Sequence, residues 1–256
     1  MYTLNDGIQI RAWGPCSTTP TGGIDRLKLR EVPAPAAPRG RHVQVRVVRA
    51  ALNPKDALFR KGRFRLLSGE RFPKWCGLDA AGEVSASNSR RLRVGDRVFG
   101  ALNEWTLARG TLAEYVVAGE DEVALLPGGV SFDEGAAIAL TGLTALQALR
   151  DVARIPPGAE VLINGASGGV GTAAIQIARL LGARATSVSS AGNLGLCADF
   201  GAAATLDYPR GDFLESGSRY DCVFDVFGNL SFARAAGAQG QGGFRQHGPI
   251  AVPGGA

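Results

Sequence analysis

Short segments in which apolar and polar residues alternate run through the first half of the chain. Valines at positions 43, 45 and 47 are separated by polar residues, which predicts a strand over residues 42–51. Further strand candidates, bounded by Gly, Asp or Asn, are residues 81–85, 97–100 and 112–118. The proline-rich run 32–38 is neither a helix nor a central strand, so we expect an extended connector there. Residues 1–130 are therefore predicted to form a compact, barrel-like β domain.

The pattern changes at Ser131. Ser131 and, three positions later, Glu134 form a capping-box pattern in front of an alanine-rich run, residues 135–140. Thr141 and Gly142 are expected to interrupt this run before a second helical stretch, residues 143–152. This region is predicted to be a helical hinge between two domains.

Strands and helices alternate after the hinge. The predicted strands are residues 160–164, 184–188, 204–206 and 222–226, and the helices between them are residues 171–181 and 193–200. Alternation of this kind indicates parallel strands joined by right-handed crossovers. We therefore predict a second domain, of α/β class, over residues 131–236.

A glycine-rich turn, residues 164–171 (NGASGGVG), directly follows the first of these strands and precedes a helix. Ala166, Gly168 and Gly171 occupy the three glycine positions of the dinucleotide fingerprint, with alanine at the first. Small residues let the backbone approach a pyrophosphate, and the unpaired amides of a helix N-terminus attract its negative charge. The turn predicts a bound dinucleotide; the alternative is a tight strand-to-helix turn without a ligand.

The end of the second parallel strand bears on which dinucleotide is bound. An NAD-selective site usually has Asp or Glu there, about 20 residues after the glycines, to bind the ribose 2′-hydroxyl. Residues 188–193 (VSSAGN) hold no carboxylate, and Ser189 and Asn193 could accommodate a 2′-phosphate. NADPH is thus the predicted cofactor. The loop also lacks an Arg or Lys to neutralise that phosphate, and a plain polar loop is the alternative.

Composition and charge exclude several function classes. The 256 residues carry a net charge of +5, but the basic residues are spread out and no nucleic-acid-binding motif is found, so we expect no nucleic-acid partner. No stretch approaches the roughly 20 apolar residues of a membrane span, and no secretory signal pattern begins the chain. We expect a cytoplasmic protein without a membrane partner. The four isolated cysteines and two histidines argue against a zinc site or a disulfide framework.

A series of motifs stands in a fixed order between residues 43 and 228. Besides the glycine turn, it comprises residues 53–56 (NPKD), 77–84 (GLDAAGEV), 95–100 (GDRVFG), 110–116 (GTLAEYV), 140–145 (LTGLTA) and 220–225 (YDCVFD). Together these motifs resemble the quinone oxidoreductase branch of the medium-chain dehydrogenase/reductase superfamily. This alcohol dehydrogenase-like group includes zeta-crystallin and the alkenal reductases.

The resemblance implies an N-terminal GroES-like β-barrel domain followed by a Rossmann domain, with the active site in the cleft between them. In zinc-dependent members a Cys stands at the position of Asn53 and a His at that of Leu78, so the resemblance implies a zinc-independent enzyme without a metal site. It also implies hydride transfer from NADPH to a small-molecule quinone or α,β-unsaturated carbonyl compound (an enone). Relatives often dimerise through a Rossmann sheet edge that is missing here, whereas the exposed edge of the fourth strand would favour self-association, so a homodimer is one expectation.

The resemblance also assigns the candidate site residues. Asn53 would hydrogen-bond the substrate oxygen as negative charge develops on it, the alternative being a turn residue before Pro54. Thr141 would lie close to the nicotinamide. The remaining assignments are the pyrophosphate-binding turn at Ala166, Ser167, Gly168, Gly169 and Val170, the adenosine end at Ser189, Asn193 and Tyr208, and the cofactor-flanking Phe227. Asp56 is expected to cap the helix that follows it, and Asp79 and Glu83 to be structural residues beside an Ala-Ala-Gly turn.

The end of the chain departs from the family. Four parallel strands are predicted before Gly228, whereas a doubly wound dinucleotide domain has six. Residues 237–256 are rich in Gly and Pro, so we expect a divergent tail that does not supply strands five and six. The Rossmann domain is thus expected to be incomplete, with its pyrophosphate site intact. A catalytically impaired NADPH-binding protein, or a truncated fragment, is the alternative to an active enzyme.

Overall fold

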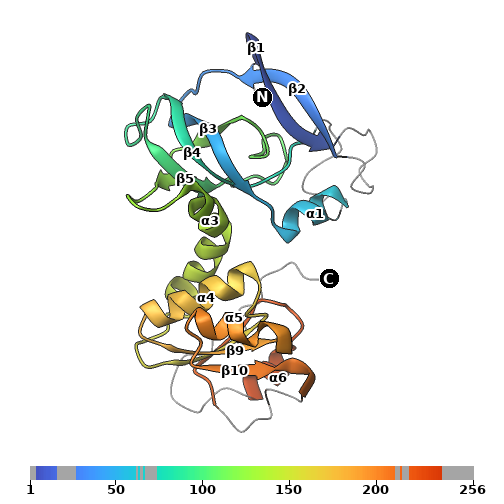
Figure 1. Ribbon diagram of the computed structural model, residues 1–256, viewed down its shortest axis with the longest axis vertical. Helices are drawn as coiled ribbons and strands as arrows, with labels where there is room; N and C mark the ends of the chain where they lie inside the picture. Colours follow the sequence, from blue (N-terminus) through green and yellow to red (C-terminus); the bar gives the residue numbers. More distant parts are fainter. Residues whose placement is uncertain are drawn as a thin grey trace. The chain divides into compact units, whose positions relative to one another are not determined.

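The computed structural model describes residues 4–15, 27–61, 63, 66, 74–210, 214 and 219–237 (Figure 1). The chain forms two compact units, which divide between Leu140 and Thr141. Each unit has its own sheet and its own apolar core. The Gly- and Pro-rich tail predicted for residues 237–256 lies, after Gly237, outside the described residues.

The first unit contains a five-stranded antiparallel sheet in the order β6-β3-β4-β5-β7. Its strands are β3 (His42–Ala51), β4 (Asp79–Ser87), β5 (Arg97–Ala101), β6 (Tyr115–Gly119) and β7 (Val123–Leu125). The predicted alternation in β3 is confirmed, because Val43 and Val45 lie in the core whereas Arg46 is exposed. The Ala-Ala-Gly sequence, residues 80–82, was wrongly predicted as a turn. It lies inside β4, where Gly82 leaves room for the carbonyl of Arg46.

A two-stranded antiparallel ribbon, β1 (Leu4–Pro15) and β2 (Leu27–Pro35), belongs to the same unit. The predicted connector over residues 32–38 is therefore wrong as far as Pro35, since Pro33 pairs with Gln9 and Pro35 with Leu4. Proline is tolerated here because β2 forms a ladder with β1 alone among the described residues. The nitrogen atoms of these prolines carry no hydrogen, and they can point away from β1, so no hydrogen bond of the ladder is lost.

The longest of the described helices, α3 (Phe132–Leu146), starts at the predicted capping box. The N–H of Ser131 donates to Glu134 Oε2 at 2.8 Å, and the N–H of Glu134 donates to Ser131 Oγ at 3.2 Å. The predicted interruption at Thr141 and Gly142 is wrong, because α3 runs through both and continues as a π-helical segment, η2 (Gln147–Val152). A glycine inside a helix costs about 1 kcal/mol but leaves the helical hydrogen bonds intact.

The second unit contains a parallel sheet in the order β10-β9-β8-β11. Its strands are β8 (Glu160–Asn164), β9 (Arg184–Ser189), β10 (Ala204–Asp207) and β11 (Cys222–Asp225). The helices are α4 (Gly169–Leu180), α5 (Leu194–Asp199) and α6 (Phe232–Gly237). The strand order reverses beside β8, so the carboxyl ends of β8, β9 and β11 meet at a switch point, where open α/β sheets bind their ligands.

Helices cover both faces of this parallel sheet. Val161 and Ile163 of β8 belong to a core that includes Ala174 of α4, whereas Leu162 shares the opposite core with Ala235 of α6. All three β8 side chains are fully buried. A strand that is apolar on both faces is typical of a parallel sheet between two helix layers. The predicted α/β class, with a β domain followed by a parallel dinucleotide-type sheet, is confirmed.

A cluster of ionised side chains joins β6 and β7 to the preceding loop. The guanidinium of Arg109 donates to Glu122 at 2.5 and 2.6 Å and to Glu104 at 3.1 Å. The side chain of Arg109 is only 18% exposed. Burial raises the pKa of both carboxyl groups, but hydrogen bonds, including those from Arg109, outweigh burial and bring each pKa below its usual value.

Replacing Arg109 by methionine should destabilise the protein. It would leave two largely buried carboxylates without their shared cation, which typically costs about 3 kcal/mol in the free energy of unfolding. Urea denaturation at pH 7 measures this change. The control is Arg46→Met, which removes an exposed partner of Glu83 and should cost about 0–1 kcal/mol. Equal losses for the two variants would contradict the prediction.

Candidate functional site

The glycine turn brings the start of α4 against the end of β8. Gly165 has a φ of +81°, a conformation that glycine adopts without strain. A Cβ added at Gly171 would lie 2.4 Å from the carbonyl oxygen of Gly165, so no other residue fits there without backbone movement. Ala166 occupies the first fingerprint position without strain because Gly165 makes the turn instead. The Ala166 side chain is buried in the core.

The exposed part of the turn fits a pyrophosphate. Gly168 is the N-cap of α4, and both Gly168 and Gly169 are exposed. A Cβ at Gly168 would meet only the Gly165 oxygen, at 3.5 Å, so the space above this residue is open. The first N–H groups of a helix have no helical acceptors, and the first turn of α4 carries no acidic residue. Backbone donors and the helix dipole therefore favour an anion at this point.

The other predicted cofactor residues of this unit lie at the same edge of the sheet. Asn193 Nδ2 donates to Ser167 Oγ at 3.3 Å and to Ser190 Oγ at 3.1 Å, which ties the loop after β9 to the glycine turn. Tyr208 directly follows β10 and is 56% exposed. Ser189, by contrast, is buried, and its Oγ accepts from the Cys197 thiol at 3.7 Å.

Thr141 and Phe227 both lie against the glycine turn. The Cγ2 atom of Thr141, on α3, would be 3.0 Å from a Cβ added at Gly169. Phe227 follows β11, and its backbone N–H donates to the carbonyl of Asn164 at 3.3 Å. Its Cβ would be 3.2 Å from a Cβ added at Gly165. The Phe227 residue is 63% exposed, so its ring is accessible beside the turn.

A buried hydrogen-bond network that shapes the loop of Phe227 was missed by the sequence analysis. Asp225, at the end of β11, is 1% exposed and accepts from the Nδ2 of Asn164 at 2.8 Å. Its oxygens also accept from the N–H of Gly228 at 2.9 Å and of Leu230 at 2.8 Å. The available signal was that Asn164 ends one predicted strand and Asp225 is the next-to-last residue of another, but only the strand order shows that these strands are neighbours.

In the first unit, two carboxyl groups hold Asn53 at the start of α1 (Pro54–Arg60). Asn53 is the N-cap of α1, and its backbone N–H donates to Asp56 Oδ2 at 2.8 Å. Asp56 was predicted to cap a helix that follows it, but it is the third residue of α1 and completes a capping box from inside this helix. Its Nδ2 donates to Asp79 Oδ2 at 2.6 Å. Asp56 and Asp79 are 8% and 1% exposed. The amide of Asn53 is therefore fixed in place, and the sequence analysis missed its contact with Asp79.

Burial dominates the electrostatics around Asn53. It raises the pKa of Asp79 to about 6 and also raises that of Asp56, against the hydrogen bonds that each accepts. Burial likewise raises the pKa of the Cys76 thiol to about 11, with a further contribution from Asp56. Burial lowers the pKa of Lys55, whose Nζ lies 3.5 Å from the ring centroid of Trp105. The group combines an oriented amide with carboxyl groups that are hard to ionise.

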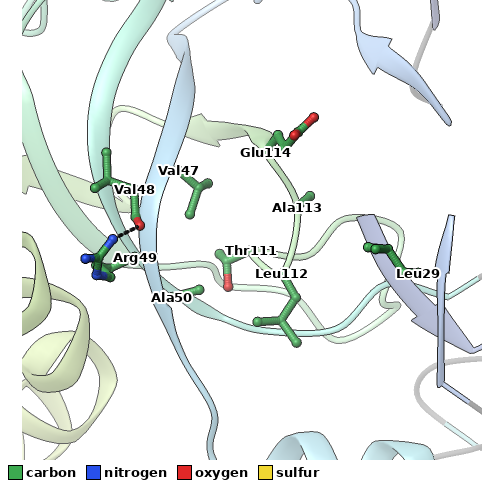
Figure 2. Close-up of a pocket in the computed structure, with 9 residues that line it drawn as sticks. All are labelled: Leu29, Val47, Val48, Arg49, Ala50, Thr111, Leu112, Ala113 and Glu114. Carbon is green, nitrogen blue, oxygen red and sulfur yellow. Dashed lines mark hydrogen bonds between the residues drawn. The ribbon is translucent and has the colours of Figure 1, made fainter. Parts of the chain in front are cut away.

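A separate pocket of about 360 Å³ lies in the first unit between β3 and residues 111–114 (Figure 2). Six of its nine lining residues are aliphatic, and Figure 2 shows the side chain of Val47 facing residues 111–114 while that of Val48 lies on the other side of the strand. The guanidinium of Arg49 donates to the carbonyl of Val48 at 2.9 Å. No predicted site residue is among the described residues that line this pocket.

Comparison with known proteins decides the family. Residues 39–128 match the model of the alcohol dehydrogenase GroES-like domain. A chloroplastic quinone-oxidoreductase homolog of Spinacia oleracea is 40% identical over 213 residues, which cover 79% of this chain and 64% of that protein. The chloroplast envelope quinone oxidoreductase homolog of Arabidopsis thaliana is 35% identical over 223 residues, or 83% of this chain and 67% of that protein. The chain belongs to the quinone oxidoreductase branch of the medium-chain dehydrogenase/reductase superfamily.

Solved structures agree with this membership. The quinone oxidoreductase from Coxiella burnetii matches this member of the superfamily with a TM-score of 0.82 at 29% identity, covering 91% of this chain and 73% of the other. Other relatives are named 2-methylene-furan-3-one reductase, NADPH-dependent alkenal/one oxidoreductase and zinc-type alcohol dehydrogenase-like protein. The chain spans 58–64% of the length of three of the relatives it matches.

Two further observations on the present chain concern metals and membranes. Within the part of the chain that the structure describes, no three His, Cys, Asp or Glu residues are grouped so that they could hold a metal ion. None of its described helices has the length and apolar character needed to cross a membrane.

Replacing Gly171 by alanine should disrupt the turn, whereas Gly168→Ala should be tolerated. The new methyl group at position 171 would press on backbone atoms that cannot rotate away, which should cost about 3 kcal/mol in the free energy of unfolding. At position 168 the methyl group enters open space, and the backbone has a φ of −78° that alanine adopts freely. Thermal and urea denaturation measure both. Equal stability of the two variants would contradict this account of the turn.

Proposed function

We propose that the protein transfers hydride from NADPH to a quinone or an α,β-unsaturated carbonyl compound, without a catalytic zinc ion. The observation that carries the proposal is the open glycine turn at the N-terminus of α4, together with membership of the quinone oxidoreductase branch. Relatives named as quinone oxidoreductase and as alkenal/one oxidoreductase support the substrate class.

The residues of the second unit fit a dinucleotide. The backbone of Ser167, Gly168, Gly169 and Val170 would hold the pyrophosphate, because these residues are exposed or half-buried and no side chain fills the space above Gly168. The N–H of Gly168 already donates to the carbonyl of Gly165 at 3.2 Å, so the neighbouring N–H groups would be the donors. Thr141 and Phe227, which touch the turn, would line the nicotinamide side, and Asn193 and Tyr208 the adenosine side. Ser189 would act through its backbone, since its hydroxyl is buried. When bound, the nicotinamide supplies the hydride.

The preference for NADPH over NADH is argued from charge. Residues 189–193 comprise the last residue of β9 and the loop after it. They contain no carboxylate that would bind a ribose 2′-hydroxyl and repel a 2′-phosphate. The polar side chains there that are half-buried are the hydroxyl of Ser190 and the amide of Asn193. One relative is named as NADPH-dependent.

Asn53 is the proposed catalytic residue of the first unit. Its amide would donate a hydrogen bond to the substrate oxygen, on which negative charge develops as hydride is accepted. The proposed independence from zinc rests on the same region. Asn53 and the core residue Leu78 stand where zinc-dependent family members carry Cys and His. Asp79 lies next to Asn53, but its carboxylate is occupied by two neutral donors.

The domain ranges 1–130 and 131–236, a cytoplasmic location and a homodimer remain predictions. A dimer is supported by the edge of the parallel sheet, where β11 pairs with β8 alone among the described residues.

Binding of NADPH should be weakened by Gly168→Ala. The methyl group leaves the fold intact but occupies the space in which the pyrophosphate would lie, so we expect a dissociation constant at least about tenfold higher. The enhancement of NADPH fluorescence measures binding, with NADH as the comparison ligand. Gly128→Ala is the control, because Gly128 is an exposed residue of the first unit, outside the proposed cofactor site, and a Cβ there meets nothing within 4 Å. Unchanged NADPH binding by folded Gly168→Ala protein would contradict the cofactor site.

Turnover should depend on Asn53. We expect the wild-type protein to oxidise NADPH in the presence of a small quinone or enone, and Asn53→Ala to lower kcat about 10²-fold through loss of the hydrogen bond to the developing oxyanion. Absorbance of the reduced cofactor measures the rate. Asn88→Ala, which changes an exposed asparagine of the same unit, should retain full activity. NADPH binding without oxidation would instead indicate a binding protein.

A further inference from the structure

Asp79 is a buried carboxyl group that, among the described residues, accepts hydrogen bonds from neutral donors only. Its Oδ2 accepts from Asn53 Nδ2 at 2.6 Å and its Oδ1 accepts from the backbone N–H of Leu140 at 2.9 Å. Its partners across the sheet are Ala51 on β3 and Ala101 on β5, which have no polar side chain. Among the described residues, no basic side chain forms an ion pair with Asp79. Such burial without a cation is costly, so the residue needs an explanation.

We propose that Asp79 is a positioning residue that fixes the orientation of the Asn53 amide. One N–H of Nδ2 is committed to Asp79, which leaves the second N–H of the same nitrogen to donate to the substrate oxygen. If the amide rotated by half a turn, its Oδ1 would face the Asp79 carboxylate, and the two oxygens would repel each other. Asp79 thereby excludes the orientation in which Asn53 would present an acceptor to the substrate. This inference rests on the proposed catalytic role of Asn53.

The orientation depends on the charge of Asp79. Burial raises its pKa to about 6, and the nearby Asp56 of α1 raises it further against the hydrogen bonds from Asn53 and Leu140. Lys55 and Arg60, on the same helix, act on Asp56 and Cys76 respectively. Below about pH 6, Asp79 becomes protonated and can donate to Asn53 Oδ1, so the amide is no longer held in one orientation. Catalysis should therefore decline as the pH falls through this value.

The same raised pKa predicts how Asp79 affects stability. A carboxyl group whose pKa is higher in the folded state stabilises the fold below the pKa of the unfolded chain, and loses this contribution as the pH rises through about 6. At pH 8 the charged Asp79 thus lowers the free energy of unfolding. Replacing it by the neutral asparagine, which has the same shape, removes this cost. A purely structural residue would have the opposite effect, because its removal would destabilise the protein.

The test compares Asp79→Asn with wild type in activity and in stability. We expect kcat with a quinone to fall about 10- to 100-fold, with a small change in the KM for NADPH, because the amide is mispositioned while the cofactor site is untouched. The acid limb of the kcat profile near pH 6 should disappear. The melting temperature at pH 8 should be equal to or above that of wild type. Glu83→Gln, on the same strand but exposed, is the matched control and should change none of these.

A second measurement does not depend on turnover. The side-chain amide resonances of Asn53, assigned by their absence from the spectrum of Asn53→Ala, should titrate near pH 6 in the wild-type protein and lose this transition in Asp79→Asn. If the protein shows no turnover but this titration is observed, the proposed function fails while the contact stands. A wild-type Asn53 amide that does not respond near pH 6 overturns the inference, even if Asp79→Asn does not fold. A folded Asp79→Asn variant with wild-type kcat and pH profile also overturns it.

Discussion

The close approach of α4 to the end of β8 is the constraint on which the second unit depends. Gly171 can lie against the carbonyl of Gly165 only because it has no side chain, and the positive φ of Gly165 turns the chain within one residue. The N–H of Ala166 donates to the carbonyl of Val188 at 3.0 Å, which fastens the turn to β9. These contacts place the N-terminus of α4 at the carboxyl edge of the sheet. Ser167 is held there by the side chain of Asn193, and Phe227 by the hydrogen bond of its N–H to the carbonyl of Asn164.

Buried carboxyl groups organise the loops of both units in a common way. Asp225 accepts from the N–H groups of two loop residues and from the amide of Asn164. Asp56 accepts from the N–H of Asn53 and of Gly77, although Gly77 is 21 positions away in the sequence. In each case the carboxyl oxygens satisfy donors that would otherwise be buried without an acceptor. Loops that carry candidate site residues, Asn53 and Phe227, are thereby held by their backbones.

Hydrophobic patterning predicted most of the fold, because burial determines the pattern. The four parallel strands and the alternation of β3 were predicted, since their side chains lie on one or two apolar faces. β1 was not predicted, and β2 was partly misread because its prolines are atypical of a strand; they are tolerated since β2 pairs with β1 alone among the described residues. The apparent break at Thr141 and Gly142 followed from residue propensities, which the continuous helix α3 overrides.

The candidate site was predictable only where it is local in the sequence. The glycine turn is contiguous in the sequence, so its residues and their proposed role were found from their spacing. That Gly165, and not Ala166 at the first fingerprint position, makes the turn was not predicted. The contact of Asn53 with Asp79 joins residues 26 positions apart, and that of Asp79 with Leu140 joins residues 61 apart. Neither leaves a periodic signal, because each depends on tertiary packing. The sequence analysis accordingly described Asp79 as structural.

The side chain of residue 53 helps to distinguish two explanations for the asparagine there, a helix cap and a catalytic group. A helix cap needs a side-chain oxygen that accepts a hydrogen bond, and Asp, Ser or Asn supplies one equally well. The atom of Asn53 that contacts Asp79 is instead Nδ2, a donor, and an aspartate at this position would place a third carboxylate beside Asp56 and Asp79. Capping alone therefore does not explain an amide here, whereas a donor held by a buried carboxylate does. The cost of burying Asp79 is understandable if the second N–H of that amide has a ligand to bind.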